Sequence, residues 1–179
     1  MSKNIFVINI HPSFSRKRIP LPTEVGRFLL AVLIELGSKL IVTDPCYKIG
    51  SEGQGVLESV NAGKYNCTAL VLDEGQWGHR VAEIEAIHED YSNVPEYRKE
   101  PFEVWVDSAM AGIFDYGQFK KLTENHDNLW TLMGEINAGL GNIIDDLGFV
   151  ATSGYGDGNY PCYTCKDNGK IIAIKVVFI

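Results

Sequence analysis

The sequence predicts an α+β fold: a single domain that is mostly an antiparallel β-sheet or β-sandwich, with one or two helices packed on it. Short β-like runs separated by turn residues fill the carboxy-terminal part of the chain. Asn168-Gly169 is a strong hairpin signal, because a type I′ turn needs positive φ at both central positions. One stretch, 127–140, instead repeats its apolar residues with helical spacing.

Composition limits the class of protein. A chain of 179 residues is long enough for a substantial core, so we expect a single domain over 1–179. The net charge is −7 and the one basic run is Arg16-Lys17-Arg18, which argues against a nucleic-acid partner. The most apolar run, 28–36, is much shorter than the roughly twenty residues of a membrane span. No secretory signal is recognisable, so we expect a cytoplasmic protein without a membrane partner.

The first part of the chain alternates strand-like runs with loops. Prolines predict a loop at 11–23. Residues 24–36 fit a buried helix and a buried strand equally well, because periodicity cannot separate the two in a continuous apolar run. Asn61-Ala62-Gly63 is expected to turn a hairpin between the strands on either side. The expected strands are 4–10, 39–43, 56–60 and 65–72.

The rest of the chain is also rich in strand-like sequence. Residues 80–88 favour a strand by alternation, although a helix would also gather several of their apolar side chains. Residues 89–101 are expected to form a surface connection. On the last strand, one wholly apolar face is expected from Ile172, Ile174, Val176 and Phe178. Further strands are expected at 102–106, 149–152, 160–166 and 171–178, and helices at 116–122 and 127–140.

The most distinctive segment is the loop 153–161, Ser-Gly-Tyr-Gly-Asp-Gly-Asn-Tyr-Pro. Its glycines allow positive φ and close approach of a partner, and its tyrosines offer contact area at low entropic cost. It leads through Pro161 into a strand, unlike a phosphate-binding loop, which opens a helix. Ordinary packing of the aromatic rings is the alternative. The candidate binding residues here are Tyr155, Gly156, Asp157, Gly158 and Tyr160.

Three more aspartates, Asp44, Asp107 and Asp115, stand at turn-like or strand-end positions. We expect them to gather with Asp157 at one rim of the sheet, beside the loop. Converging carboxylates bind Ca²⁺ or Mg²⁺, so a divalent metal site is one interpretation. The other is that each aspartate caps its own turn.

Cys162 and Cys165 have the spacing of half a zinc site. No second pair accompanies them, and positions i and i+3 of a strand point to opposite faces. We therefore expect structural thiols rather than metal ligands.

Four blocks of sequence follow one another along the chain: Gly37-Ser-Lys-Leu-Ile-Val-Thr-Asp-Pro45, Ala62-Gly-Lys-Tyr65, Val106-Asp-Ser-Ala-Met-Ala-Gly-Ile-Phe-Asp115 and the loop 153–161. Together they resemble the bacterial domain-of-unknown-function family numbered 4241. The resemblance covers 37–179, leaves 1–36 as an amino-terminal segment, and implies a mostly β domain found in bacterial and phage genomes. It supplies no catalytic residue and no substrate. Members usually carry a glycine near the position of Ala109 or Met110.

Two functions fit these observations. The first, which we favour, is a non-enzymatic binding module that presents the loop 153–161 to a protein or small-molecule ligand and needs no cofactor. It is favoured because no pairing of a base with a nucleophile is recognisable in the sequence. The second is a divalent-metal-dependent hydrolase in which the aspartates hold the ion and activate water.

Overall fold

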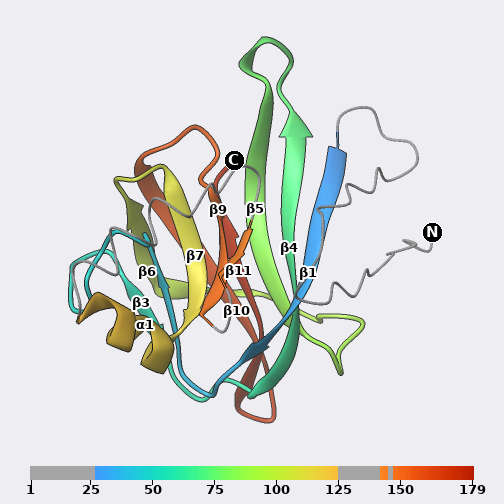
Figure 1. Ribbon diagram of the computed structural model, residues 1–179. Coiled ribbons are helices and arrows are strands. Elements are labelled where there is room, and N and C mark those ends of the chain that lie inside the picture. Colours follow the sequence, from blue (N-terminus) through green and yellow to red (C-terminus); the bar gives the residue numbers. More distant parts are fainter. Residues whose placement is uncertain (1–26, 125–141, 145–146) are drawn as a thin grey trace.

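Two antiparallel β-sheets make up most of the computed structural model, which describes residues 27–124, 142–144 and 147–179 (Figure 1). Sheet A has six strands in the order β1 (Arg27–Leu36), β4 (Gly63–Asp73), β5 (His79–His88), β11 (Lys170–Val177), β10 (Gly158–Asp167) and β6 (Arg98–Val106). Sheet B has five, in the order β3 (Gly55–Leu57), β2 (Leu40–Thr43), β7 (Met110–Asp115), β9 (Gly148–Thr152) and β8 (Asn142–Ile144).

The two sheets share one apolar core. Sheet A contributes fully buried side chains such as Tyr65, Ile84 and Ile174, and sheet B contributes Leu40 and Ile113 to the same cluster. Alternation produces this arrangement, because every second side chain of a strand points to the same face. Burying each of the larger side chains stabilises the fold by about 1.5–3 kcal/mol. The faces of the sheets that meet here therefore hold the two layers together.

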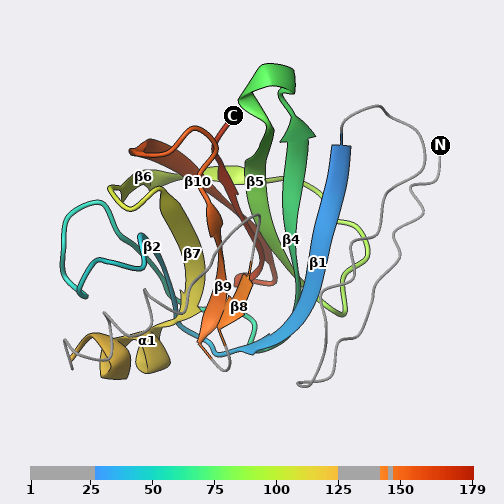
Figure 2. The same ribbon diagram turned by 45° about the horizontal axis from the view of Figure 1, so that its top comes forward.

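The outer face of sheet B is covered by the helix α1 (Tyr116–Thr123) (Figure 2). Its Phe119 is buried and stacks on Phe114 of β7, with 4.8 Å between ring centroids. Asp115 is the N-cap residue of this helix, and its carboxylate caps the first turn. No helix in the described ranges is long and apolar enough to cross a membrane.

The outer face of sheet A is partly covered by the segment that joins β5 to β6. Tyr91, Val94 and Tyr97 from this segment pack against a small buried cluster on β10 and β11. The Tyr97 hydroxyl donates a hydrogen bond to Glu85 (2.7 Å), and Lys175 pairs with the same carboxylate (3.1 Å). Apolar contacts and a polar network thus fix this connection to the sheet.

Several expectations from sequence are confirmed. Residues 80–88, whose alternation favours a strand, lie in β5. Residues 24–36, for which the sequence favours neither a helix nor a strand, contain the strand β1. The short helix expected at 116–122 is α1, and Asn168-Gly169 turns the β10–β11 hairpin with φ of 47° and 79°. The expected helix 127–140, the strand 4–10 and the loop 11–23 lie outside the described residues.

The hairpin expected around Asn61-Ala62-Gly63 is wrong. β3 pairs with β2 in sheet B, whereas β4 pairs with β1 and β5 in sheet A, so the chain changes sheets between them. The Val60 N–H donates to Ser38 (2.9 Å) and the Asn61 N–H to Ile171 (2.8 Å), which guides the crossing. Hydrogen bonds to residues distant in sequence, rather than the turn residues 61–63, therefore determine the path of the chain between β3 and β4.

Two smaller expectations also need correction. The connection 89–101 is shorter than expected, because β6 already begins at Arg98. The last strand does not keep Ile172 on the face of Ile174, because the β10–β11 ladder shifts register between Cys165 and Lys166. A β-bulge of this kind reverses which face a side chain occupies. Ile172 consequently joins the cluster on the outer face of sheet A.

Candidate binding site

Asp44 lies at the centre of the aspartate cluster. It follows β2, and its side chain is fully buried. Oδ1 accepts hydrogen bonds from the Cys46 N–H (2.7 Å) and the Ser108 hydroxyl (2.7 Å). Oδ2 accepts from the N–H groups of Asp107 (2.8 Å) and Ser108 (2.8 Å). These four donors compensate the buried charge and join the turn after β2 to the turn after β6.

Asp107 and Asp157 belong to the same group of turns. The Tyr47 hydroxyl donates a hydrogen bond to Asp107, and this bond, together with some burial, raises the pKa of Tyr47 to about 12. Asp157 accepts from the Ala109 N–H (3.0 Å), and the Ala109 carbonyl accepts from the Ser153 N–H (3.0 Å). Hydrogen bonds therefore connect three of the four aspartates that were expected to gather.

Ala109 joins the turn after β6 to the loop 153–161 in an unusual conformation. Its φ is 55°, in the left-handed region that favours glycine. An alanine in this region costs roughly 1–2 kcal/mol.

Asp115 is not part of the cluster. β7 has six residues, and Asp115 stands at its end. The turn that contains Ala109 precedes the other end of the strand. Its carboxylate accepts from the N–H groups of Gln118 (3.0 Å) and Gly37 (3.2 Å). Asp115 thus caps α1 and stabilises the turn between β1 and β2. This agrees with the interpretation in which each aspartate caps a turn rather than binds a metal ion.

Hydrogen bonds among its own residues hold the loop 153–161, called the glycine loop below, in one conformation. The Gly156 N–H donates to the Ser153 carbonyl (2.7 Å), and the Ser153 hydroxyl donates back to the Gly156 carbonyl (2.7 Å). The Tyr160 hydroxyl donates to that carbonyl as well (2.7 Å), while its ring packs edge-on against Phe178. Gly154 has φ of 53°, and a Cβ there would lie 3.0 Å from the Cβ of Phe178. Tyr160 and the glycines therefore shape the loop.

Tyr155 is the side chain that the loop presents to solvent. It is 58% exposed, and its hydroxyl donates to the Glu74 carboxylate (3.0 Å) at the end of the β4–β5 hairpin. The Arg80 guanidinium lies 5.7 Å from the centroid of its ring, within the range of a cation–π contact. Hydrogen bonding to Glu74 is the main cause that raises the pKa of Tyr155 above its ordinary value. The loop and the hairpin therefore form one surface.

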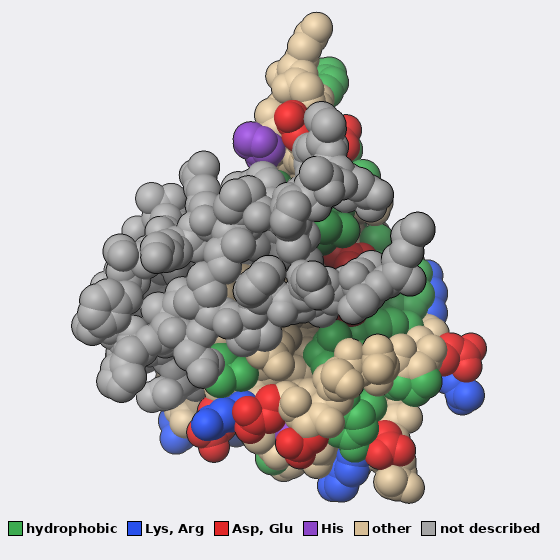
Figure 3. Space-filling view, turned by 90° about the vertical axis from the view of Figure 1, so that its right-hand side faces the viewer, with side chains coloured by type: hydrophobic (Ala, Val, Ile, Leu, Met, Phe, Trp, Pro, Cys, Tyr) green, Lys and Arg blue, Asp and Glu red, His purple; other side chains and the backbone are tan. Residues whose placement is uncertain are grey.

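The end of this hairpin was not expected as part of a site. A single 3₁₀ turn, η1 (Gly75–Trp77), closes it, and the Trp77 side chain is 69% exposed. Figure 3 shows this end projecting beyond the rest of the surface, with acidic and histidine side chains near its tip. The sequence did contain a sign of an exposed turn here, because Gly75 and Gly78 flank the tryptophan. What the sequence lacked was the long-range contact to Tyr155.

The cation-binding interpretation gains no support from these contacts. In the described ranges, no group of three His, Cys, Asp or Glu side chains is close enough to hold a metal ion. Both oxygens of Asp44 already serve other donors. Cys162 belongs to the core between the sheets and Cys165 to the outer cluster, so the two thiols face opposite sides of sheet A. The calcium or magnesium site remains a prediction from sequence alone.

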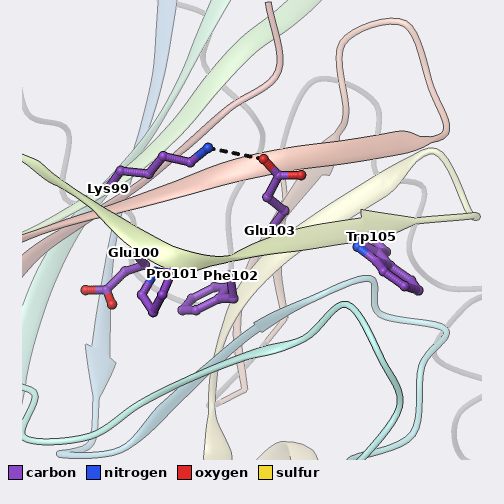
Figure 4. Close-up of a pocket in the computed structure, with 6 residues that line it drawn as sticks. All are labelled: Lys99, Glu100, Pro101, Phe102, Glu103 and Trp105. Carbon is purple, nitrogen blue, oxygen red and sulfur yellow. Dashed lines mark hydrogen bonds and ion pairs between the residues drawn. The ribbon is translucent and has the colours of Figure 1, made fainter.

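Two surface depressions are lined by residues that do not belong to the aspartate cluster. One, of about 530 Å³, runs along β6 (Figure 4). In it Lys99 pairs with Glu103 (3.2 Å), while Phe102 and Trp105 point toward the segment 53–55, where glycines allow the rings to approach the backbone. The other, of about 460 Å³, is next to Asp115.

Comparison with known proteins identifies no relative: no family model, no curated protein and no solved structure matches the chain. The resemblance to the family numbered 4241 accordingly stays a prediction.

Proposed function

We propose that this protein is a non-enzymatic binding module that contacts a protein partner through its aromatic end, meaning the hairpin residues 73–80 together with the loop 153–157. The observation that carries the proposal is the exposure of Trp77 (69%) and Tyr155 (58%) on two segments joined by the bond between Tyr155 and Glu74. Burying a large apolar side chain contributes roughly 1.5–3 kcal/mol. A partner that covers both rings would recover that free energy.

The chemistry of this end suits protein recognition. Binding energy at protein interfaces is concentrated in a few side chains, most often tryptophan, tyrosine and arginine. Trp77, Tyr155 and Arg80 supply one of each, and Arg80 already contacts the Tyr155 ring.

The backbone that carries these side chains is ordered before binding. At the hairpin tip, the Glu74 N–H donates to the Gly78 carbonyl (2.9 Å), and the Gly78 N–H donates to Gly75 (3.0 Å). The glycine loop is closed by its own bonds between Ser153 and Gly156. Less conformational entropy is lost on binding when the binding segments are preorganised.

A protein is a better candidate than a small molecule. Small-molecule sites are concave and enclose most of the ligand. The aromatic end projects from the surface, and the depressions near β6 and Asp115 do not include Trp77 or Tyr155. A projecting pair of rings instead fits a hollow in another protein.

The charge of this end indicates the character of the partner surface. Asp73 and Asp157 are exposed, Glu74 is half-buried, and the whole chain carries a net charge of −7. A partner surface with basic groups around an apolar hollow would be complementary. Its association should then slow as salt rises, because screening weakens attraction between exposed charges.

Photo-crosslinking in extracts of the native host tests the proposal. A benzophenone amino acid is placed at position 77, at position 155 and, as a matched control, at the exposed Trp105 on β6. We expect the same partner to be captured from positions 77 and 155 but not from 105. Trp77→Ala and Tyr155→Ala should each reduce its recovery in a pull-down. Equal capture at all three positions, or recovery that both alanine variants leave intact, would show that the partner binds elsewhere.

A further inference from the structure

The two edge strands of sheet A differ in how they are protected. The β6–β10 ladder is interrupted where Glu103 and Lys99 pair with Pro161 and Tyr163, so that β6 bulges between them. This bulge contains Pro101, which has no N–H to donate. The Trp105 N–H is already bonded to the Gly53 carbonyl (2.9 Å). Bulges, prolines and charges are the devices that keep an edge strand from pairing with another chain.

β1 has no bulge and no proline, and its two charged residues, Arg27 and Glu35, stand near its ends. It pairs with β4 in unbroken register over ten residues, from Arg27 opposite Leu72 to Leu36 opposite Gly63. No strand flanks it on the other side within the described residues, and Figure 2 shows it at the margin of the sheet. Its sequence, Arg-Phe-Leu-Leu-Ala-Val-Leu-Ile-Glu-Leu, is apolar at both sets of alternate positions. Such a pattern is typical of a strand whose two faces are both covered.

We propose that β1 of a second copy of this chain pairs with this edge, antiparallel about a two-fold axis at Ala31. The sequence of β1 contains two charged residues, Arg27 and Glu35, placed symmetrically about that position. Antiparallel pairing centred on Ala31 puts position 27 of each copy directly opposite position 35 of the other. Opposite charges that face each other across two strands are favourable, and symmetry provides this pair twice.

The charges also select the register. A shift of two residues in either direction would place position 27 opposite position 33 or 37, which are Leu33 and Gly37. Both charged pairs would then be lost, while the apolar residues alone would tolerate several registers. Glu35 is exposed in the single chain, whereas Ile34 and Leu36 face the core. Glu35 thus lies on the outer face of the sheet, where its carboxylate remains accessible to water.

The resulting dimer would continue sheet A across both copies. The backbone groups on the free side of β1 would gain partners, and the half-buried Val32 and Leu33 would gain cover. Arg27 lies opposite Leu72, next to the aromatic end, whereas Glu35 lies opposite Lys64 at the other end of β1. Position 35 therefore tests self-association apart from partner binding.

Analytical ultracentrifugation of the full chain with charge-reversed variants tests the pairing. The wild-type protein should form dimers, and Arg27→Glu should weaken dimerisation by about tenfold, because two attractive pairs become repulsive. Glu35→Arg should act in the same direction, although position 35 also lies opposite Lys64 of its own chain. Mixing the two variants should restore a heterodimer, in which every facing pair is again Arg with Glu. Arg98→Glu on the protected strand β6 is the matched control and should leave the dimer unchanged.

Three results would overturn the proposal: a wild-type protein that stays monomeric at high concentration, dimerisation that Arg27→Glu does not weaken, or a mixture that fails to recover. If the single variants do not fold, hydrogen exchange of the wild-type protein decides instead. Protection of the amides at 28–36 that rises with protein concentration supports the pairing, and protection independent of concentration refutes it.

Discussion

Replacing Asp44 by asparagine should destabilise the fold strongly. The carboxylate is fully buried and accepts four hydrogen bonds, two on each oxygen. An asparagine amide keeps one oxygen and replaces the other by an NH₂ group, which cannot accept a hydrogen bond. Two of the four donors would then face another donor instead of an acceptor.

The magnitude follows from those two lost bonds. A hydrogen bond to a charged group contributes about 1.5–3 kcal/mol, so Asp44→Asn should lower the free energy of unfolding by about 3–6 kcal/mol. That is a large share of the roughly 5–15 kcal/mol typical of a native domain. Ser108→Ala removes one such bond and should cost about 1.5–3 kcal/mol. Asp107→Asn is the matched control: its carboxylate is exposed, so the cost should stay below about 1 kcal/mol.

Urea unfolding of the three variants, measured without added divalent cations, checks this order. If Asp44 mainly served a cation, its replacement would relieve repulsion with the nearby Asp107 and leave the cation-free protein equally or more stable. An unchanged or raised unfolding midpoint for Asp44→Asn would therefore refute the structural role. It would also revive the metal-dependent hydrolase.

Three further predictions concern strain, pH and packing. Ala109→Gly should raise the free energy of unfolding by up to about 1 kcal/mol, because glycine relieves the left-handed strain at the cost of a more flexible unfolded chain; a lower thermal midpoint would contradict this. The raised pKa of Tyr47 means that its bond to Asp107 contributes fully below pH 10 and is lost as the pH rises through about 12. The stability difference between the wild-type protein and Tyr47→Phe should accordingly shrink over that window, and a constant difference would argue against the bond. Gly55→Ala should cost about 1–3 kcal/mol, because the added Cβ would lie 1.8 Å from the Phe102 ring, and Phe102→Leu should restore part of the loss.

Local features were predictable because their causes are local. The Asn168-Gly169 turn depends on the φ preferences of two residues, and α1 follows a capping aspartate at position 115. The prevalence of antiparallel strands followed from alternating runs between turn signals. None of these inferences required knowledge of a distant contact.

Strand pairing was less accessible, because it depends on which segments bury each other's side chains. The segment at 61–63 has a good turn sequence, yet it carries the chain from one sheet to the other. A register shift in the β10–β11 ladder moves Ile172 to the opposite face from the one that simple alternation predicts. Bulges and sheet changes leave little trace in a single sequence.

The candidate site also combines features with local causes and features that depend on distant contacts. The sequence alone identified the glycine loop and the aspartates as unusual, since their turn chemistry is written in adjacent residues. Tertiary structure decided which of them meet. The N–H groups of one turn, 107–109, donate to Asp44 and Asp157, while Asp115 stands at the other end of β7. Tyr155 meets the distant Glu74. A contact between residues 81 positions apart arises only when two sheets pack, because the packing sets the distance between hairpin and loop.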